Sequence, residues 1–527
     1  MMAEIQLATG LMLTVLTWLG LRLMVGAPLV GSRGAYRLAP LLLDGFAPFV
    51  GFALWVIGTG RPIMAGLGIA SAGVGLGVAD RIKRVVLQEP TLFADRSELI
   101  EVVRHPRLYL AFVGTGRMIA GSLGCVAIVG GLIWIEPPLW RLPLGLAVAA
   151  PFIAIGMGRL LFVVPTMPAL LERLAAAYER WLPSRDPAMD AARFGLLASF
   201  VVQATLARHE RPARQRAAQM RSMRAMPADA GPILLVQGES FMGGRRLHPA
   251  LAALTPNFER LQRSGVQQGA LEVPCWGANT IRSELAILAG LGEAELGLDR
   301  FNPYEHFARV PLPSLAQAAR TAGYRTVCVH PYERAFYARD RVMPQLGFDE
   351  FIALESFAEA PRVNGYVTDV AVAERVAALV REHGSRLLVF AITMENHGPW
   401  NGFAPGIELP QPVRLHAQAG PLSHWLRGLA ATDAMIPILE RVLDEAGSGW
   451  LLFYGDHQPS LAGAFAALGH AARKTDYVIW SPSCVPGTRI DLPAEELGAA
   501  LLARMDERCA NPLVVKAKQE LNRSTRL

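Results

Sequence analysis

In this chain of 527 residues, the clearest indication of the architecture is Pro232-Ile233-Leu234-Leu235-Val236-Gln237-Gly238-Glu239-Ser240. Its apolar run has the length of a β-strand and ends in a glycine followed by a carboxylate. Because ligands bind beyond the carboxyl ends of strands in open parallel sheets, Glu239 stands where a metal or a polar substrate would lie. Two later stretches have side chains suited to meet it, namely Asn279-Thr280-Ile281-Arg282-Ser283-Glu284 and Tyr454-Gly455-Asp456-His457. We predict that one metal ion is held by Glu239, Thr280, Asp456 and His457.

Short apolar runs alternate with helical patterns from Gly231 onward. The expected strands cover residues 232–236, 325–329, 387–393, 450–454 and 477–480. The expected helices cover residues 313–322, 368–382 and 424–445, and Gly323 is suited to end the first of them. Such alternation is typical of an α/β domain with a largely parallel sheet and helices on both faces.

Thr280 precedes an apolar helical run at residues 285–289, and two interpretations of it stay open. With Ser283 and Glu284 it forms a helix-start signal, so it could be a plain N-cap. Alternatively it is a nucleophile at a helix N-terminus, where free backbone N–H groups stabilise phosphate oxygens. The rest of the constellation favours the nucleophile.

Asp456 and His457 follow the apolar run Trp450-Leu451-Leu452-Phe453-Tyr454. A strand that ends in Gly-Asp-His presents a carboxylate and an imidazole at the rim of the sheet. Oxygen and imidazole ligands suit zinc or manganese. His457 could instead be a hydrogen-bonded core histidine, but its place beside an aspartate after a buried strand favours a ligand.

Two more histidines, His330 and His397, come directly after apolar strands. Near the first of them lies Phe336-Tyr337-Ala338-Arg339-Asp340, in which an arginine has aromatic neighbours. Arginine with an aromatic neighbour suits the binding of a phosphate and an attached polyol. In isolation this segment would be interpreted as a solvated turn.

The N-terminal part of the chain is the apolar part. Hydrophobic residues make up 52% of the sequence, and they concentrate before about residue 165. Roughly 20 apolar residues cross a bilayer core. Five stretches meet this test, at residues 5–30, 38–60, 62–80, 109–135 and 143–165. We expect the first to be an uncleaved anchor, and Asp44 in the second to lie at a helix end.

The orientation of these spans has two conflicting indications. Basic residues crowd the loop between the third and fourth spans, and the positive-inside rule would place this loop in the cytoplasm. With five spans, the α/β part would then be cytoplasmic too. The chemistry of the candidate site favours the outer face.

Residues 166–230 are expected to form an interfacial linker. Its apolar segment 194–202 is too short to span a membrane and is flanked by arginines. It could lie along the membrane surface or be a packed connector helix. We expect residues 231–510 to be the catalytic domain and residues 511–527 a polar tail. The net charge of +6 is modest, and without a nucleic-acid motif we expect no nucleic-acid partner.

The motifs around Glu239, Thr280, Asn396-His397 and Asp456-His457, in this order, resemble those of the lipoteichoic acid synthase family. This family belongs to the alkaline phosphatase and sulfatase superfamily. Its members have five membrane spans before an extracytoplasmic catalytic domain. The resemblance therefore implies a multi-pass protein of the bacterial inner membrane, with a membrane domain at residues 1–165 and a periplasmic sulfatase-like domain after the linker.

The resemblance also implies roles for the site residues. Glu239, Thr280, Asp456 and His457 would hold a divalent metal, usually manganese, with magnesium or zinc as alternatives. Thr280 would be the nucleophile, and His397 would contact the phosphate or assist proton transfer. The residues implied to bind glycerol phosphate are His330, Tyr337 and Arg339. The family commonly has tryptophan in place of Tyr337, so this chain departs from the pattern there.

The implied reaction is the transfer of glycerol phosphate from phosphatidylglycerol to an acceptor. The acceptor would be an envelope glycan or a polyglycerolphosphate chain, and membrane lipid would be a further partner. A sulfatase, a phosphatase or a phosphoethanolamine transferase of the same superfamily are the alternatives. A formylglycine sulfatase needs a Cys/Ser-x-Pro-x-Arg motif, which the segment starting at Cys275 lacks. A membrane sensor without catalysis is a further alternative, against which the complete set of ligand types argues.

Overall fold

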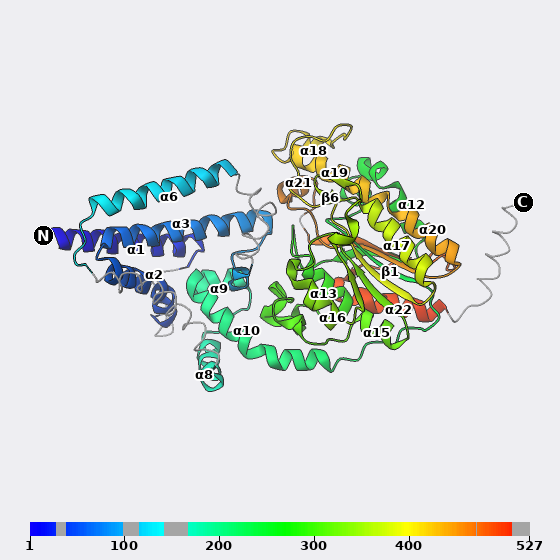
Figure 1. Ribbon diagram of the computed structural model, residues 1–527, viewed down its shortest axis with the longest axis horizontal. Coiled ribbons are helices and arrows are strands. Elements are labelled where there is room, and N and C mark those ends of the chain that lie inside the picture. Colours follow the sequence, from blue (N-terminus) through cyan, green and yellow to red (C-terminus); the bar gives the residue numbers. More distant parts are fainter. Residues whose placement is uncertain (28–37, 98–114, 142–166, 471, 509–527) are drawn as a thin grey trace, which may run out of the picture. The chain divides into compact units, whose positions relative to one another are not determined.

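The computed structural model describes residues 1–27, 38–97, 115–141, 167–470 and 472–508. The chain divides into two compact units, Met1–Pro212 and Ala213–Leu527 (Figure 1). The predicted tail, residues 511–527, lies outside the described residues, which end at Arg508. The domain boundaries of the sequence analysis stay a prediction.

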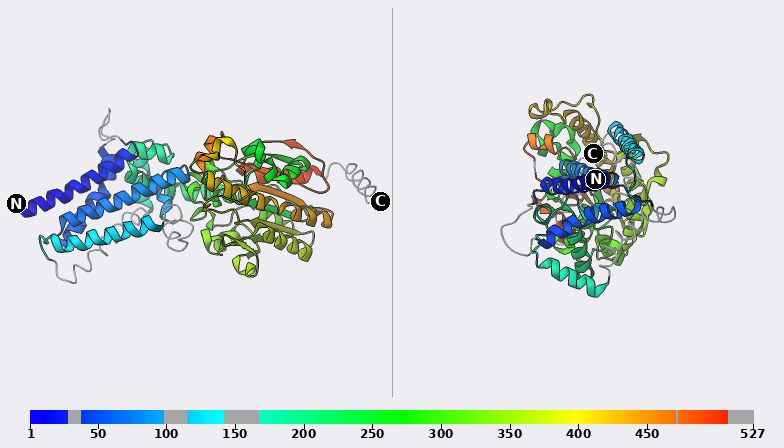
Figure 2. Two further views of the ribbon diagram at one scale, coloured as in Figure 1. Left: turned by 90° about the horizontal axis from the view of Figure 1, so that it is seen from above. Right: turned by 90° about the vertical axis from the view of Figure 1, so that its left-hand side faces the viewer.

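Three helices of the first unit are long and apolar enough to cross a membrane. They are α1 (Met2–Met24), α2 (Leu38–Thr59) and α3 (Pro62–Val86). A further helix, α6 (Thr115–Ile135), falls within the predicted span 109–135, whereas the predicted span 143–165 lies outside the described residues. Helices α1, α3 and α6 run side by side (Figure 2). The number of five spans therefore stays a prediction.

The buried carboxylate of Asp44 joins three segments of the first unit. Asp44 lies in the second turn of α2, not at its end, and its Oδ2 accepts hydrogen bonds from Arg22 Nη1 at 2.7 Å and Trp18 Nε1 at 2.9 Å. Its Oδ1 accepts from the backbone N–H groups of Leu197 at 2.9 Å and Ala198 at 3.1 Å. A carboxylate at a helix N-terminus satisfies N–H groups that have no partner within the helix.

The predicted linker contains three helices, α8 (Pro168–Glu179), α9 (Pro187–Phe194) and α10 (Leu196–Gln219). Asp44 caps α10, and Gly195, with φ +101°, makes the turn before it. Leu196 is buried and packs with Val25, Ala27 and Ala191. This packing favours the connector helix over a helix that lies on the membrane surface.

We expect Asp44→Asn to destabilise the first unit, because it removes the charge that faces the buried guanidinium of Arg22. Breaking a buried pair in this way costs about 3–5 kcal/mol. The measurement is the unfolding temperature of the full chain in detergent. Glu4→Gln is the control, because Glu4 is exposed. An unchanged unfolding temperature for Asp44→Asn would contradict this account.

The second unit is built on a nine-stranded sheet with the order β10-β2-β9-β8-β1-β7-β3-β4, in which β11 pairs with β2. Its strands are β1 (Ile233–Gly238), β2 (Gln267–Glu272), β3 (Arg325–Val329), β4 (Glu350–Ile352), β7 (Leu387–Ile392), β8 (Trp450–Gly455), β9 (Lys474–Trp480), β10 (Thr488–Arg489) and β11 (Leu492–Pro493). Strand β9 runs antiparallel to β2 and β8, and the other pairs are parallel. A hairpin of β5 (Arg362–Val363) and β6 (Tyr366–Val367) stands apart. All five predicted strands are present, and the prediction of a largely parallel sheet is confirmed.

Helices cover both faces of this sheet (Figure 1). One face carries α12 (Pro256–Ser264), α17 (Asp369–His383), α19 (Ala419–Asp433) and α20 (Ile436–Ala446). The other carries α13 (Ile281–Ala289), α15 (Leu315–Thr321), α16 (Arg339–Gln345) and α22 (Ala494–Arg508). Because both faces are covered, the central strand β1 is buried throughout and its sequence is apolar from Ile233 to Val236.

The remaining described helices are short. They are α11 (Gly244–Leu247), α14 (Glu293–Leu296), α18 (Gln411–Arg414), α21 (Ala462–Ala467) and the 3₁₀ turns η2 (Phe93–Arg96), η4 (Pro249–Leu254), η5 (Gly297–Phe301), η6 (Phe307–Arg309), η7 (Phe336–Ala338) and η8 (Leu354–Phe357). The predicted helix 424–445 is two helices, because Pro437 cannot donate a hydrogen bond to the preceding turn and α20 starts anew there. Gly323 follows α15 with φ +84°, as predicted.

The register of the central strands brings the predicted site segments to one edge. Gly238 at the end of β1 pairs with Gly455 at the end of β8, so Glu239 and Asp456 leave neighbouring strands at the same level. On the other side of β1, β7 ends at the same edge, and β3 lies beyond it. His330 and His397 therefore follow strands that end at this edge too.

Candidate metal and nucleophile site

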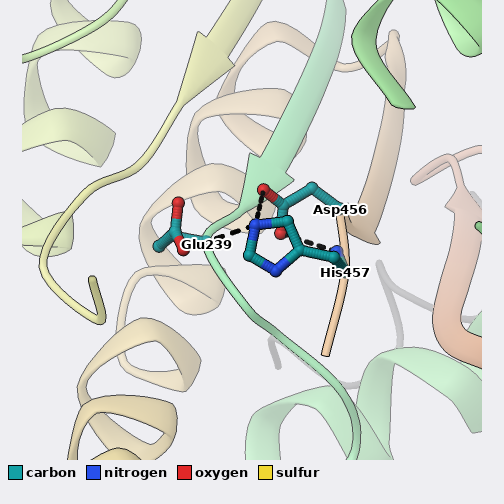
Figure 3. A group of neighbouring side chains, drawn as sticks. All are labelled: Glu239, Asp456 and His457. Carbon is teal, nitrogen blue, oxygen red and sulfur yellow. Dashed lines mark hydrogen bonds and ion pairs between the residues drawn. The ribbon is translucent and has the colours of Figure 1, made fainter. Parts of the chain in front are cut away.

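Glu239, Asp456 and His457 form one buried cluster at the carboxyl edge of the sheet. One ligand atom from each lies within 4.8 Å of the others. His457 Nε2 is 3.3 Å from Asp456 Oδ2 and 3.8 Å from Glu239 Oε1. Figure 3 shows the imidazole facing both carboxylates. Two segments that are distant in sequence, one with Glu239 and one with Asp456 and His457, thus present ligand atoms to one point.

The hydroxyl of Thr280 reaches the same point. Its Oγ1 lies 3.5 Å from His457 Nε2. Thr280 directly precedes α13, but its side chain makes no capping hydrogen bond to the helix. The side chain is therefore turned to the cluster and does not act as a plain N-cap. The structure brings the four predicted ligands together, and metal binding by them stays a prediction.

The tautomer of His457 follows from its hydrogen bonds. Its Nδ1 lies 2.9 Å from the carbonyl oxygen of Gln458, and a carbonyl oxygen can only accept. The proton of the neutral ring is therefore on Nδ1, and the lone pair is on Nε2. Orientation of a metal-binding histidine by a hydrogen bond from its other nitrogen is usual at metal sites.

The electrostatics of the cluster fit a divalent cation. Burial and the nearby Glu239 raise the pKa of Asp456 to about 7, against the opposing effect of His457. Burial would lower the pKa of His457, but Asp456 and Glu239 overcome this effect and raise it. The Oδ2 atom of Asp456 is buried and has no hydrogen-bond partner among the described residues. A cation would satisfy this oxygen and offset the two buried carboxylates.

Hydroxyl groups that the sequence analysis did not assign hold the ligands in place. Ser240 Oγ donates to Glu239 Oε1 at 2.8 Å, and Ser240 N donates to Asp456 Oδ1 at 2.8 Å. Thr393 Oγ1 accepts from Glu239 N at 2.9 Å, and Ser283 Oγ donates to the Asp456 carbonyl at 2.7 Å. The position of Ser240 beside Glu239 was a usable signal. Thr393 and Ser283 reach the site only through tertiary contacts.

Backbone strain concentrates around the candidate residues. Among the described residues of the second unit, the non-glycine residues with positive φ are Ser240, Asn279, Tyr337, Ala338 and Asn364. All but Asn364 lie directly beside, or are, a predicted site residue. Such conformations cost about 1–3 kcal/mol each and cluster at functional sites.

The structure gives Arg339 a partner that the sequence analysis did not foresee. Arg339 is 1% exposed, and its guanidinium forms a salt bridge with the buried carboxylate of Glu284. Its Nη1 lies 3.2 Å from His330 Nε2, and its guanidinium stands 5.4 Å from the ring of Tyr337. The structure thus brings the three predicted substrate-binding residues together, with Arg339 bound to protein groups.

His397 lies on a loop whose position is fixed by hydrogen bonds. Its Nδ1 is 2.7 Å from the carbonyl oxygen of Gly398, and the hydroxyl of Tyr366 is 3.3 Å from the same nitrogen. Two residues earlier, Glu395 exchanges hydrogen bonds with Asp369. Glu395 N donates to Asp369 Oδ1 at 3.2 Å, and Asp369 N donates to Glu395 Oε2 at 2.8 Å.

The comparison with protein families assigns the second unit. Residues 232–494 match the family model described as Sulfatase. The chain belongs to the sulfatase family. It is thus a member of the alkaline phosphatase and sulfatase superfamily, whose members typically bind divalent metals.

Two curated relatives of this sulfatase-family chain come from Rhizobium meliloti (strain 1021). Capsular polysaccharide biosynthesis protein RkpI is 29% identical over 417 residues, which are 76% of this chain and 74% of the relative. A putative cyclic beta-1,2-glucan modification protein is 24% identical over 322 residues, 56% of this chain and 50% of the relative. The match thus spans about half the length of this second relative.

Solved structures similar to this sulfatase-family chain include a phosphoglycerol transferase and a lipoteichoic acid synthase. Phosphoglycerol transferase GacH of Streptococcus pyogenes, in complex with sn-glycerol-1-phosphate, is 20% identical with a TM-score of 0.45, covering 60% of this chain and 90% of GacH. Lipoteichoic acid synthase LtaP of Listeria monocytogenes is 17% identical with a TM-score of 0.42, covering 55% of this chain and 77% of LtaP.

We expect Mn²⁺ to stabilise the folded full chain and so to raise its unfolding temperature. At a Mn²⁺ concentration a hundredfold above Kd, the stabilisation should be about 2.7 kcal/mol. Asp456→Asn should lose most of this stabilisation, because it removes one carboxylate charge from the cluster. Asp506→Asn is the matched control, since Asp506 forms an exposed ion pair. Equal stabilisation of wild type and Asp456→Asn by Mn²⁺ would contradict the site, and parallel titrations with Mg²⁺ and Zn²⁺ rank the metals.

The buried carboxyl of Asp369 predicts a pH dependence. Burial and the neighbouring Glu395 raise the pKa of Asp369 to about 7, against about 3.9 in an unfolded chain. The folded state therefore holds a proton that the unfolded state releases. The contribution of Asp369 to stability is present below about pH 4 and is lost as the pH rises to about 7.

Asp369→Asn should remove this pH dependence, because the amide mimics the protonated carboxyl at every pH. The difference in unfolding temperature between variant and wild type should then change between pH 5 and pH 7, and level off above. Asp229→Asn, at an exposed position, is the control. A difference that does not depend on pH would show that Asp369 is ionised throughout.

Proposed function

We propose that the chain is a membrane-anchored, metal-dependent phosphoglycerol transferase. The observation that carries this proposal is the position of the Thr280 hydroxyl, 3.5 Å from His457 Nε2 in the cluster of Glu239, Asp456 and His457. Thr280 also stands at the N-terminus of α13, where backbone N–H groups and the helix dipole favour an anion. A hydroxyl beside ligand atoms and an anion-binding helix end suits attack on a phosphate ester.

The residues Glu239, Asp456 and His457, with Thr280, would hold the cation, most suitably Mn²⁺. Such a cation lowers the pKa of a hydroxyl and offsets charge on phosphoryl oxygens. Glu239 and Asp456 are oriented for this by Ser240, and His457 by the carbonyl of Gln458. The proposed nucleophile and the residues that would hold the cation are therefore positioned before substrate binds.

The proposed transfer has two displacement steps. In the first, Thr280 Oγ1 forms a bond to the phosphorus of phosphatidylglycerol, and the bond to the diacylglycerol oxygen breaks. The proton released by Thr280 is taken up by the departing oxygen, which leaves as diacylglycerol. In the second, an acceptor hydroxyl displaces Thr280 from phosphorus, and its proton returns to the threonine.

His397 is the residue suited to carry these protons. Its Nδ1 is 2.7 Å from the Gly398 carbonyl, so the neutral ring has its proton there and its lone pair on Nε2. The Nε2 atom can accept a proton and return it. We propose that His330, Tyr337 and Arg339 form the binding site for the glycerol phosphate group.

The proposed setting is the bacterial inner membrane, with the second unit on the extracytoplasmic side. A lipid donor accounts for the apolar helices of the first unit, because they keep the enzyme at the headgroups. The proposed acceptor is an envelope glycan, which agrees with the names of the two Rhizobium relatives, one in capsular polysaccharide biosynthesis and one in glucan modification. Polyglycerolphosphate is the alternative acceptor.

We expect Thr280→Ala to abolish the release of diacylglycerol from labelled phosphatidylglycerol in the presence of Mn²⁺. The loss should be at least about 10³-fold, as for other removed nucleophiles. Thr280→Ser retains a hydroxyl and should retain part of the activity. Thr321→Ala is the matched control, because Thr321 is exposed on α15. Equal release by wild type and Thr280→Ala, or none by wild type, would reject the transferase.

A further inference from the structure

The buried carboxylate of Glu284 has no part in the transfer described above. It is 0% exposed and lies in the first turn of α13, where its backbone N–H donates to the Thr280 carbonyl at 3.0 Å. The nucleophile and this carboxylate are therefore one helical turn apart on the same rigid segment. Because a buried carboxylate is costly unless it is paired, its partners indicate its role.

Four donor atoms from three segments surround Glu284. Its Oε2 accepts from Arg339 Nε at 3.2 Å and from the hydroxyl of Tyr304 at 2.9 Å. Its Oε1 accepts from Arg339 Nη2 and, at 3.5 Å, from Gln237 Nε2. The hydroxyl of Tyr454 donates to Gln237 Oε1 at 2.6 Å, which turns the amide N–H groups towards Glu284. The carboxylate is thus held in one orientation.

Arg339 uses its two edges for different partners. The edge formed by Nε and Nη2 binds Glu284 in the two-point manner that fits a carboxylate. On the other edge, Nη1 lies 3.2 Å from His330 Nε2. A guanidinium can only donate, so Nε2 of His330 must accept and the ring carries its proton on Nδ1.

The charge state of His330 agrees with this hydrogen bond. Burial and the positive charge of Arg339 hold the pKa of His330 well below its usual range. The ring is therefore neutral. As a neutral ring with its proton on Nδ1, which is buried beside the backbone of Ile392, it brings no charge of its own.

We propose that Glu284, one helical turn after Thr280, is a positioning residue that acts through Arg339 to hold His330 as a neutral ring protonated on Nδ1. The group that it positions, Arg339 with His330 and Tyr337, would bind a polyol phosphate. The ligand identity rests on the proposed function. The linkage from Glu284 to His330 does not, because it follows from the contacts of the protein alone.

Steady-state kinetics of the full chain test the linkage, with phosphatidylglycerol as substrate. Glu284→Gln should raise KM about tenfold or more, the range for a lost hydrogen bond to a charged group, with a smaller effect on kcat. Arg339→Lys should do the same, because a lysine cannot bind Glu284 and His330 at once. In the double variant the effect of Glu284→Gln should disappear, since it acts through Arg339. Additive effects would overturn the proposal.

A matched control and a milder variant guard against loss of folding. Glu350→Gln removes the carboxylate of a half-exposed ion pair with Arg325 and should leave both kcat and KM unchanged. Tyr304→Phe removes a single donor to Glu284 and should shift KM in the same direction as Glu284→Gln, but less. In each variant, stabilisation by Mn²⁺ reports on the ligand cluster and should persist. Loss of Mn²⁺ stabilisation together with the KM effect would mean a general structural defect and would reject a positioning role.

Imidazole ¹⁵N chemical shifts of the full chain in liposomes test the tautomer without any substrate. The signal of His330, assigned by its absence in His330→Gln, should be that of a neutral ring protonated on Nδ1. In Glu284→Gln this signal should change. A proton on Nε2 in wild type, or an unchanged signal in Glu284→Gln, would overturn the proposal. If the wild type releases no diacylglycerol but shows the expected signal, the proposed function fails and the linkage stands.

Discussion

The register between β1 and its neighbour β8 is the constraint on which the candidate site depends. Gly238 pairs with Gly455, and the chain beyond β1 turns back across both, so close that a Cβ on Gly455 would stand 1.8 Å from the Phe241 carbonyl oxygen. A side chain at this position would push the turn away and part Glu239 from Asp456. A shift of one residue would also reverse every buried side chain of β1. The buried sheet thus fixes the separation of two charged groups that repel each other.

The sequence allowed this much to be predicted because strand ends and ligand types are local signals. The apolar runs of β1, β3, β7 and β8 are recognisable without a structure, and the residues after parallel strands must share an edge. Strand β2 was not foreseen, because its sequence Gln267-Gln268-Gly269 has little intrinsic preference for a strand. Its pairing with β9 and β10 overrides that preference. The break between α19 and α20 depends on one proline and was missed because the apolar pattern continues across it.

Partners of charged residues were the part that the sequence could not supply. Arg339 was expected to face a substrate, and its type and aromatic neighbours were correctly noted. Its counter-charge, Glu284, lies 55 residues earlier, in the same motif as Thr280, where it was interpreted only as a helix-start residue. The same holds for Asp44, whose burial is explained by Arg22 and by the N-terminus of α10. Only the folded chain shows which of the many charged residues a given one meets.

The residues around the site that have a left-handed backbone conformation have a consequence for laboratory evolution. Asn279 stands at φ +68° directly before Thr280, and glycine would adopt this conformation without strain. A library selected only for heat resistance should therefore accumulate glycine there, since it gains stability where the native residue is strained. The same exchange would loosen the segment that aims the threonine. Robustness and turnover would then be selected in opposite directions at a single codon.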